Sequence, residues 1–249
     1  MINEIRDYEK RLNFKCQFMG HAHRLADAFR DPELYYFTFM SLPDDGKRIM
    51  SLRATRRGIY QLWVLKLICE ALGVSRFLYP RGYDGGAYWW VEQGSGFSTC
   101  IGETPYGSVS SWLEFQPSRV AHVLAYVRSI LTGEHMSTGK RVPIRPDIVV
   151  VRGYYERTSD FVNSGKGIDV LVECKEDPLD MWKNDINSQI LPYLHIFKPR
   201  IFILASLRSV PDHVKNFLSR KGIIVVDELR PRNSSVRLLH EILSSQFSQ

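Results

Sequence analysis

Two stretches of sequence decide the fold of this chain: Arg145-Pro146-Asp147-Ile148-Val149-Val150-Val151 and Asp169-Val170-Leu171-Val172-Glu173-Cys174-Lys175. Both are short apolar runs rich in Val and Ile, which is typical of neighbouring buried strands, and a polar connection that contains glycine joins them. Each run also carries an acid where a buried strand normally has none, and the second run adds a lysine. Buried charges of this kind are tolerated when they are paired or hold a metal.

The alternation of side chains along a strand predicts where these charges point. Glu173 and Lys175 lie two residues apart and so face the same way, about 6.6 Å apart, while Cys174 faces the opposite way. Asp147 stands at the mouth of the neighbouring strand, and we expect it to converge on the same point. Two carboxylates and an ammonium around one point would suit a divalent cation and the hydrolysis of a phosphodiester.

Composition sets the limits of this interpretation. A chain of 249 residues suits one large domain, or a core domain with an appended N-terminal part. The net charge of +6 favours a polyanionic partner, because neutralised phosphates release their counterions. Four scattered cysteines without a CxxC pair indicate neither a disulfide framework nor a zinc ribbon. No apolar run approaches the about 20 residues that span a membrane, and the charged N-terminus is unlike a signal peptide. We therefore expect a cytoplasmic protein without a membrane partner.

Periodicity and breaker residues predict the elements around the two strands. Before them we expect a helix at 5–29, a basic segment at 47–57, a helix at 59–72 that ends at Gly73, a β-meander within 77–115 and a helix at 119–131. The clearest strands of the meander are 87–91 and 111–115. After them we expect a helix from Asp177-Pro178 to about Ile190, a strand at 200–205, a helix at 211–220, a strand at 222–226 and a helix at 234–245. This alternation predicts an α/β architecture with helices packed on a mixed sheet.

The Pro-Asp and Glu-x-Lys spacing, in the order strand, hairpin, strand, helix, strand, resembles the PD-(D/E)xK nuclease superfamily. The resemblance covers about the last hundred residues well and the N-terminal half only loosely. It implies a restriction-endonuclease-like fold in which Asp147 and Glu173 ligate Mg2+ or Mn2+ while Lys175 positions or activates the attacking water. Mg2+ prefers carboxylate oxygens and keeps several waters, which agrees with a site of two carboxylates.

A second motif follows on the expected helix. Gln189-Ile190-Leu191-Pro192-Tyr193 is similar to the QxxxY element of RecB-like nucleases, in which the glutamine helps to order the active site. Residues four apart share a helix face, so Gln189 and Tyr193 would both turn toward the site. Pro192 lies inside this motif and is predicted to end or kink the helix.

A third acidic ligand stays open at the level of the sequence. Many members of the superfamily carry one on the first core helix, where this chain has Glu70 near the end and Gln61 near the start. Glu92 and Glu114, on the expected meander, are rival candidates.

The sequence thus predicts a nuclease-like α/β domain over residues 56–249, preceded by a helical and basic extension over residues 1–55. The expected activity is metal-dependent hydrolysis of DNA, with endonuclease favoured over exonuclease action and RNA as an alternative substrate. The expected catalytic residues are Asp147, Glu173, Lys175 and Gln189. A homodimer would suit a nuclease that cuts both strands of a duplex. The alternative is a catalytically inactive nuclease fold that binds nucleic acid or assembles a complex.

Overall fold

The computed structural model describes residues 49–79, 96–115 and 145–247 of the chain. The chain divides into two compact units, Met1–Trp63 and Val64–Gln249, and the strands found among the described residues belong to the second. The helices predicted at 5–29 and 119–131, the clearest meander strand at 87–91, and Lys47 and Arg48 of the basic segment lie outside the described residues. Within the described ranges, no helix combines the length and apolar character needed to cross a membrane.

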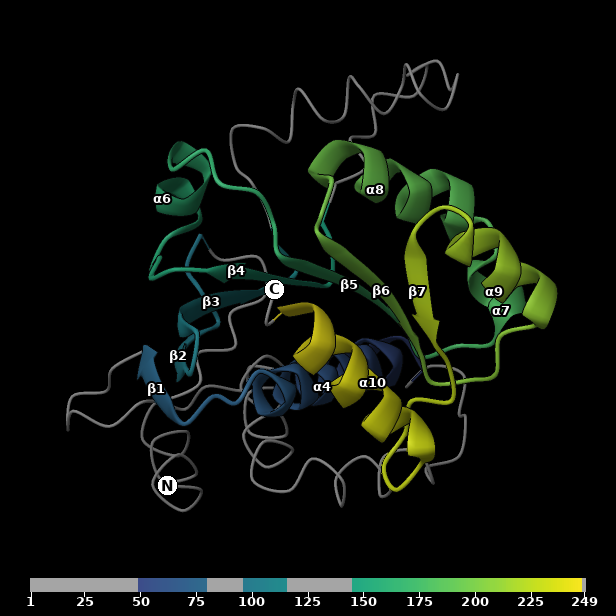
Figure 1. The fold of residues 1–249 in the computed structure, drawn as a ribbon. Coiled ribbons are helices and arrows are strands. Elements are labelled where there is room, and N and C mark those ends of the chain that lie inside the picture. Colours follow the sequence, from purple (N-terminus) through teal and green to yellow (C-terminus); the bar gives the residue numbers. More distant parts are fainter. Residues whose placement is uncertain (1–48, 80–95, 116–144, 248–249) are drawn as a thin grey trace, which may run out of the picture. The chain divides into compact units, whose positions relative to one another are not determined.

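A seven-stranded sheet organises the second unit, and its strands follow one another in chain order (Figure 1). The strands are β1 (Arg76–Tyr79), β2 (Cys100–Thr104), β3 (Gly107–Leu113), β4 (Ile148–Arg152), β5 (Val170–Lys175), β6 (Ile201–Ser206) and β7 (Ile223–Val226). Strands β1 to β5 pair antiparallel, whereas β5, β6 and β7 pair parallel. The chain is therefore an α/β protein with a mixed sheet, as predicted.

The described residues also form helices, and some of them connect the parallel strands. The helical elements are α4 (Ile49–Ala71), α6 (Thr158–Asn163), α7 (Leu179–Trp182), the π-helix η1 (Ile186–Ile190), α8 (Leu191–Phe197), α9 (Asp212–Ser219) and α10 (Ser234–Phe247). In Figure 1, α7, α8 and α9 lie on one side of β5, β6 and β7, and α10 lies on the other side. This arrangement follows because successive right-handed crossovers that advance along a sheet in one direction place their helices on one face.

One face of the sheet carries a large apolar core. Val149 and Leu171, which lie opposite each other on β4 and β5, point into it together with Phe202 of β6. Trp182 of α7 and Val214 of α9 pack onto them from the crossover helices. All six residues of β5 and all six of β6 are buried, which explains why these central strands are almost continuously apolar.

Several predicted elements are confirmed within a residue or two. They are the two motif strands, the strand at 200–205, the helix at 211–220, the strand at 222–226 and the helix at 234–245. The predicted helix at 59–72 is present as α4, but it begins ten residues earlier, at Ile49, and so includes part of the basic segment. The strand predicted at 111–115 belongs to β3, which ends at Leu113 because Glu114 adopts a positive φ of 50°.

The connection between β4 and β5 contains a helix that we did not predict. α6 has only six residues, too short to show a helical period in the sequence. Its Phe161 packs against Trp112, Phe115 and Tyr155, with ring centroids 5.6 to 6.0 Å apart.

The prediction of a single helix from Asp177-Pro178 to Ile190 is wrong, because this segment forms three consecutive helical elements. α7 is a single turn, η1 follows as a π-helix, and α8 runs on to Phe197. Pro192 does not end the helix, because it lies in the first turn of α8. A proline is tolerated there, since a first-turn N–H has no intrahelical acceptor. The helix ends instead where Lys198 adopts the left-handed conformation, with φ 44°.

Candidate active site

The register of β4 and β5 brings the two predicted acids together. Ile148 pairs with Val172 and Val149 with Leu171, so the next position along this antiparallel pair sets Asp147 opposite Glu173. Directly opposed residues share a face, with Cβ atoms about 4.5–5.5 Å apart. Both residues are buried, with 0% and 1% of their surface exposed. This is the face that α7, η1 and α8 cover, because it also carries Val149 and Leu171.

Asp147 is fixed from both neighbouring strands. Its Oδ2 accepts a hydrogen bond from the backbone N–H of Cys174, at 2.8 Å. Its backbone carbonyl accepts the N–H of Glu114, at 2.7 Å, and the carbonyl of Pro146 accepts the N–H of Phe115, at 3.0 Å. The Pro-Asp segment therefore continues the ladder beyond the end of β3 and holds the carboxylate in place.

Lys175 joins the strands to the crossover helix. Its Nζ donates to Oε1 of Glu173 at 3.0 Å and to Oδ2 of Asp185 at 2.6 Å. A longer hydrogen bond, 3.4 Å, reaches Oε1 of Gln189. The ammonium is buried, so these oxygens replace most of its water.

Burial alone would lower the pKa of Lys175, because a low-dielectric surrounding disfavours the charged form. The carboxylates of Glu173, Asp147 and Asp185 outweigh that effect and raise the pKa of Lys175 above its ordinary value. In this arrangement the lysine is an ammonium at neutral pH. In this form it can orient water and stabilise negative charge.

The π-helix aims two side chains at Lys175. Asp185 immediately precedes η1 and Gln189 lies within it. Positions four apart lie on the same side of a helical turn. Both side chains reach the same Nζ atom as a result. π-turns of this kind are frequent at functional sites.

Tyr193 supports the acid-bearing strand and not the lysine. It is buried, and its hydroxyl oxygen accepts the backbone N–H of Arg145 at 3.1 Å. Arg145 lies two residues before Asp147, so the hydroxyl anchors the entrance to β4. The two polar members of the QxxxY element thus bind the two halves of the candidate site, Gln189 the lysine and Tyr193 the Pro-Asp segment.

The site lies at the edge of the sheet where β5 and β6 end. Lys175 is the last residue of β5 and pairs with Ser206, the last residue of β6. In α/β sheets with parallel strands, ligands bind outside these carboxyl ends.

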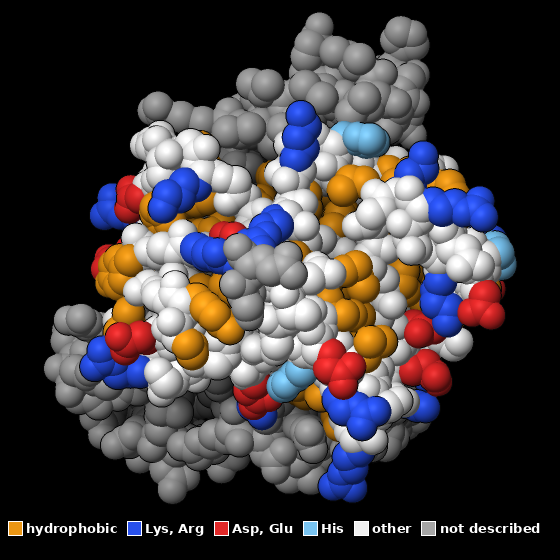
Figure 2. Space-filling model, in the orientation of Figure 1, with side chains coloured by type: hydrophobic (Ala, Val, Ile, Leu, Met, Phe, Trp, Pro, Cys, Tyr) orange, Lys and Arg blue, Asp and Glu red, His pale blue; other side chains and the backbone are white. Residues whose placement is uncertain are grey.

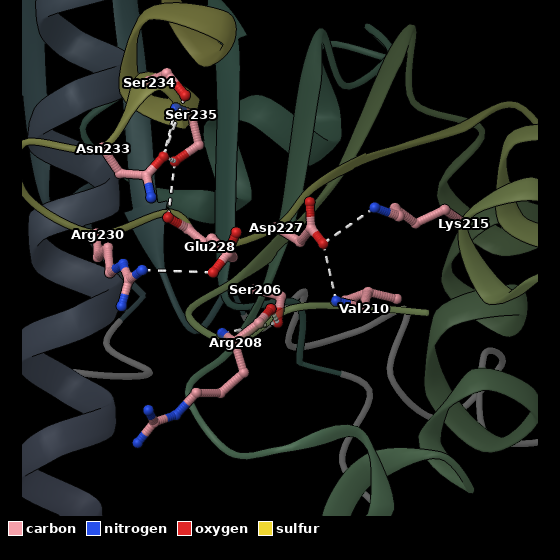
Figure 3. A network of polar contacts seen from close by, with 10 residues as sticks. All are labelled: Ser206, Arg208, Val210, Lys215, Asp227, Glu228, Arg230, Asn233, Ser234 and Ser235. Carbon is pink, nitrogen blue, oxygen red and sulfur yellow. Dashed lines mark hydrogen bonds and ion pairs between the residues drawn. The ribbon is translucent and has the colours of Figure 1, made fainter. Parts of the chain in front are cut away.

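Polar contacts fix the loops at this edge (Figure 3). The hydroxyl of Ser206 donates to the carbonyl of Arg208 at 2.8 Å, directly after β6. Directly after β7, Asp227 accepts the N–H of Val210 at 2.9 Å and the ammonium of Lys215 at 3.3 Å. The candidate site therefore stands beside loops that are tied to one another.

Two of the candidates for a third acid, Glu70 and Glu114, pair with basic residues instead. Glu70 is exposed on α4 and pairs with Lys66, at 3.2 Å. Glu114 is buried, but its carboxylate pairs with Arg145, also at 3.2 Å. Glu92 lies outside the described residues, and Gln61 belongs to the other compact unit.

The donor set fits a divalent cation held by few protein ligands. Asp147, Glu173 and Asp185 all act on the ammonium of Lys175, so three carboxylates lie around one point. Among the described residues, no group of three or more His, Cys, Asp or Glu side chains is placed to hold a metal ion. Mg2+ is commonly bound by one or two carboxylates and otherwise by water and phosphate oxygens, which matches this set.

Asp185 is the residue of this cluster that the sequence analysis missed. The sequence could have indicated it, because Asp185 stands four residues before Gln189 on the same predicted helix and so shares its face. The hydrogen bond between Tyr193 and Arg145 could not be predicted from local sequence, since it joins residues 48 positions apart in the chain.

The chain was compared with known proteins in three ways. No family model matches it, and neither a curated protein nor a solved structure was found to be similar. The functional argument therefore depends on the site itself.

Proposed function

We propose that this chain is a metal-dependent nuclease that hydrolyses phosphodiester bonds in DNA, with a restriction-endonuclease-like fold. One observation carries the proposal: two buried carboxylates, Asp147 and Glu173, oppose each other on adjacent strands, and the ammonium of Lys175 contacts the second. A core excludes such charges unless they are paired or functional. Carboxylate oxygens gathered at one point are also the ligands that Mg2+ prefers.

The order of elements supports the fold assignment. An antiparallel meander of β3, β4 and β5 is followed by a helical crossover and the parallel strand β6. This is the order that the resemblance to the PD-(D/E)xK superfamily implies, with the motif residues on the second and third strands of the meander. The polar residues of the QxxxY element lie on the crossover, where the resemblance expects them.

Each residue has a role that its contacts allow. Asp147 and Glu173 would hold Mg2+ or Mn2+, which when bound supplies Lewis-acid chemistry to the phosphodiester and to the attacking water. Water adds to phosphorus and one P–O ester bond breaks, leaving a phosphomonoester and an alcohol. Lys175 orients the water and stabilises the negative charge that develops on the phosphoryl oxygens. Gln189 holds Lys175 through its amide oxygen.

The test is cleavage by purified protein with Mg2+, with Mn2+ and with EDTA. Supercoiled plasmid, single-stranded DNA and single-stranded RNA are compared side by side, because plasmid nicking distinguishes endonuclease from exonuclease action. We expect metal-dependent cleavage of DNA by the wild type. Glu173→Gln keeps the shape of the side chain but removes its charge, and we expect a loss of at least about 100-fold in rate.

Glu241→Gln is the matched control for that variant. Glu241 is exposed on α10 and pairs only at the surface, with Arg237, so we expect its rate to equal that of the wild type. DNA binding without cleavage under any metal condition would refute the nuclease and leave the inactive binding module. Equal rates for Glu173→Gln and the wild type would place any nuclease activity elsewhere in the chain.

A further inference from the structure

Asp185 makes the shortest contact that Lys175 has, although it lies outside the Pro-Asp, Glu-x-Lys and QxxxY motifs. Its Oδ2 is 2.6 Å from Nζ, compared with 3.0 Å for Oε1 of Glu173. The two acids reach the ammonium from different depths. The side chain of Glu173 is 1% exposed, whereas that of Asp185 is 34% exposed. Lys175 therefore bridges a buried acid, Glu173, and a partly exposed acid, Asp185.

Two cations would compete for the carboxylate of Glu173, and Asp185 can relieve this competition. The Oε1 atom of Glu173 holds the lysine ammonium, and the same carboxylate is a proposed ligand for a divalent cation. Two cations compete for this carboxylate if the ammonium has no other anionic partner. Asp185 offers one, and Gln189 adds a neutral acceptor on the same turn.

We propose that Asp185 is a positioning residue that holds the ammonium of Lys175 and so leaves Glu173 available to a divalent cation. This inference rests on the proposed function, because it assigns Asp185 to the same site. Asp185 is fixed for this role by its place at the start of the π-helix, where the backbone turn directs it and Gln189 to one atom. Loss of its charge transfers the ammonium to Glu173 and weakens cation binding there.

The test measures Mn2+ binding by calorimetry in the absence of DNA, and cleavage in its presence. Asp185→Asn removes the charge at nearly constant shape, and we expect its Kd for Mn2+ to rise about 10- to 100-fold, the range found for residues that orient metal ligands. At saturating Mn2+ we expect kcat to fall while KM for DNA stays unchanged. Asp185→Glu restores the charge and recovers most of the affinity.

Asp180→Asn is the matched control, because Asp180 lies on the preceding turn with its side chain 89% exposed. We expect its Kd for Mn2+ and its kcat to equal those of the wild type. An unchanged Kd in folded Asp185→Asn overturns the inference alone, whatever the cleavage assay shows. Binding of Mn2+ by a wild type that cleaves no nucleic acid overturns the proposed function alone. A wild type that binds no Mn2+ overturns the inference, and one that in addition cleaves no DNA overturns both.

Discussion

Lys175 is the residue on which the buried charges of the site depend. It contacts Glu173 and Asp185 directly, and the charge of Asp147 also acts on it. Because these carboxylates raise its pKa, the stabilisation from the ammonium is complete below the unfolded value of about 10.4 and is lost only as pH rises through the higher folded value. At neutral pH the full contribution of the ion pairs is therefore present.

Replacing Lys175 by Met should destabilise the fold more than replacing both members of the pair. The single variant leaves the nearly inaccessible Glu173 carboxylate without its ammonium, and breaking a buried pair in this way costs about 3–5 kcal/mol. Adding Glu173→Gln removes the stranded charge, so we expect the double variant to regain more than half of the loss. Urea unfolding at neutral pH with EDTA measures both free energies. A double variant less stable than Lys175→Met alone would contradict this account.

The crossover from β5 to β6 is the element that completes the site. Its course as α7, η1 and α8 gives Asp185, Gln189 and Tyr193 three separate contacts with the motif strands. A continuous α-helix would place residues four apart about 6 Å apart along its axis and rotate them by about 40°. Residues at that spacing share a helix face, and here the side chains of Asp185 and Gln189 span the separation and meet at one Nζ atom.

The sequence predicts the strands of this region well and the crossover poorly, for a physical reason. Buried strands are apolar over their whole length, so β5 and β6 are visible as Val- and Ile-rich runs. The π-turn has no comparable sequence pattern. Pro192 predicts a helix end from local sequence alone, but the helix continues through it, and the neighbouring Tyr193 and Ile190 pack into the core. The shared face of Glu173 and Lys175 follows from strand alternation, whereas the register that opposes Asp147 to Glu173 and the long-range bond of Tyr193 to Arg145 do not.

Removal of the Tyr193 hydroxyl tests how the crossover holds the Pro-Asp segment. Tyr193→Phe takes the acceptor from the N–H of Arg145, which should cost about 1 kcal/mol in the free energy of unfolding. We expect a loss of about 10-fold in kcat, because a small displacement of a catalytic group reduces rate steeply. Tyr154→Phe is the control: Tyr154 is exposed, and its hydroxyl donates to Glu156 at the surface. Equal rates for Tyr193→Phe and the wild type would mean that the position of Asp147 does not depend on this bond.

At the scale of the whole molecule, net charge does not by itself mark a binding surface. The chain carries +6, yet Figure 2 shows Lys and Arg side chains spread over the displayed face, with acidic side chains between them. A basic patch would be needed to argue phosphate binding from charge alone. The proposal of phosphodiester hydrolysis therefore rests on the residues at the carboxyl ends of β5 and β6 and not on net charge.

The end of the second unit is tied to the sheet by two arginines. The guanidinium of Arg152, on β4, donates to the carbonyl of Phe247 and stands 4.5 Å from the centre of its ring. Arg200 donates to the carbonyl of Gln246 at 2.6 Å. Both bonds satisfy terminal carbonyls of α10, where a positive charge also complements the helix dipole. Arg152 is the last residue of β4, and Asp147 immediately precedes the first, so this contact lies at the opposite end of the strand from the site.

Arg152→Met should therefore lower the stability of the fold without lowering the rate of cleavage. Loss of a hydrogen bond from a charged donor costs about 1.5–3 kcal/mol, so we expect a lower free energy of unfolding in urea. The rate of DNA cleavage per folded molecule should stay at the wild-type value, because the carboxylates of Asp147 and Glu173 keep their contacts. Arg237→Met is the matched control on α10: Arg237 is 81% exposed and pairs with Glu241, a surface pair that contributes less than about 0.5 kcal/mol. Equal stability of the two variants would show that the bond from Arg152 contributes nothing measurable to holding α10, whose Leu239 and Leu243 are fully buried.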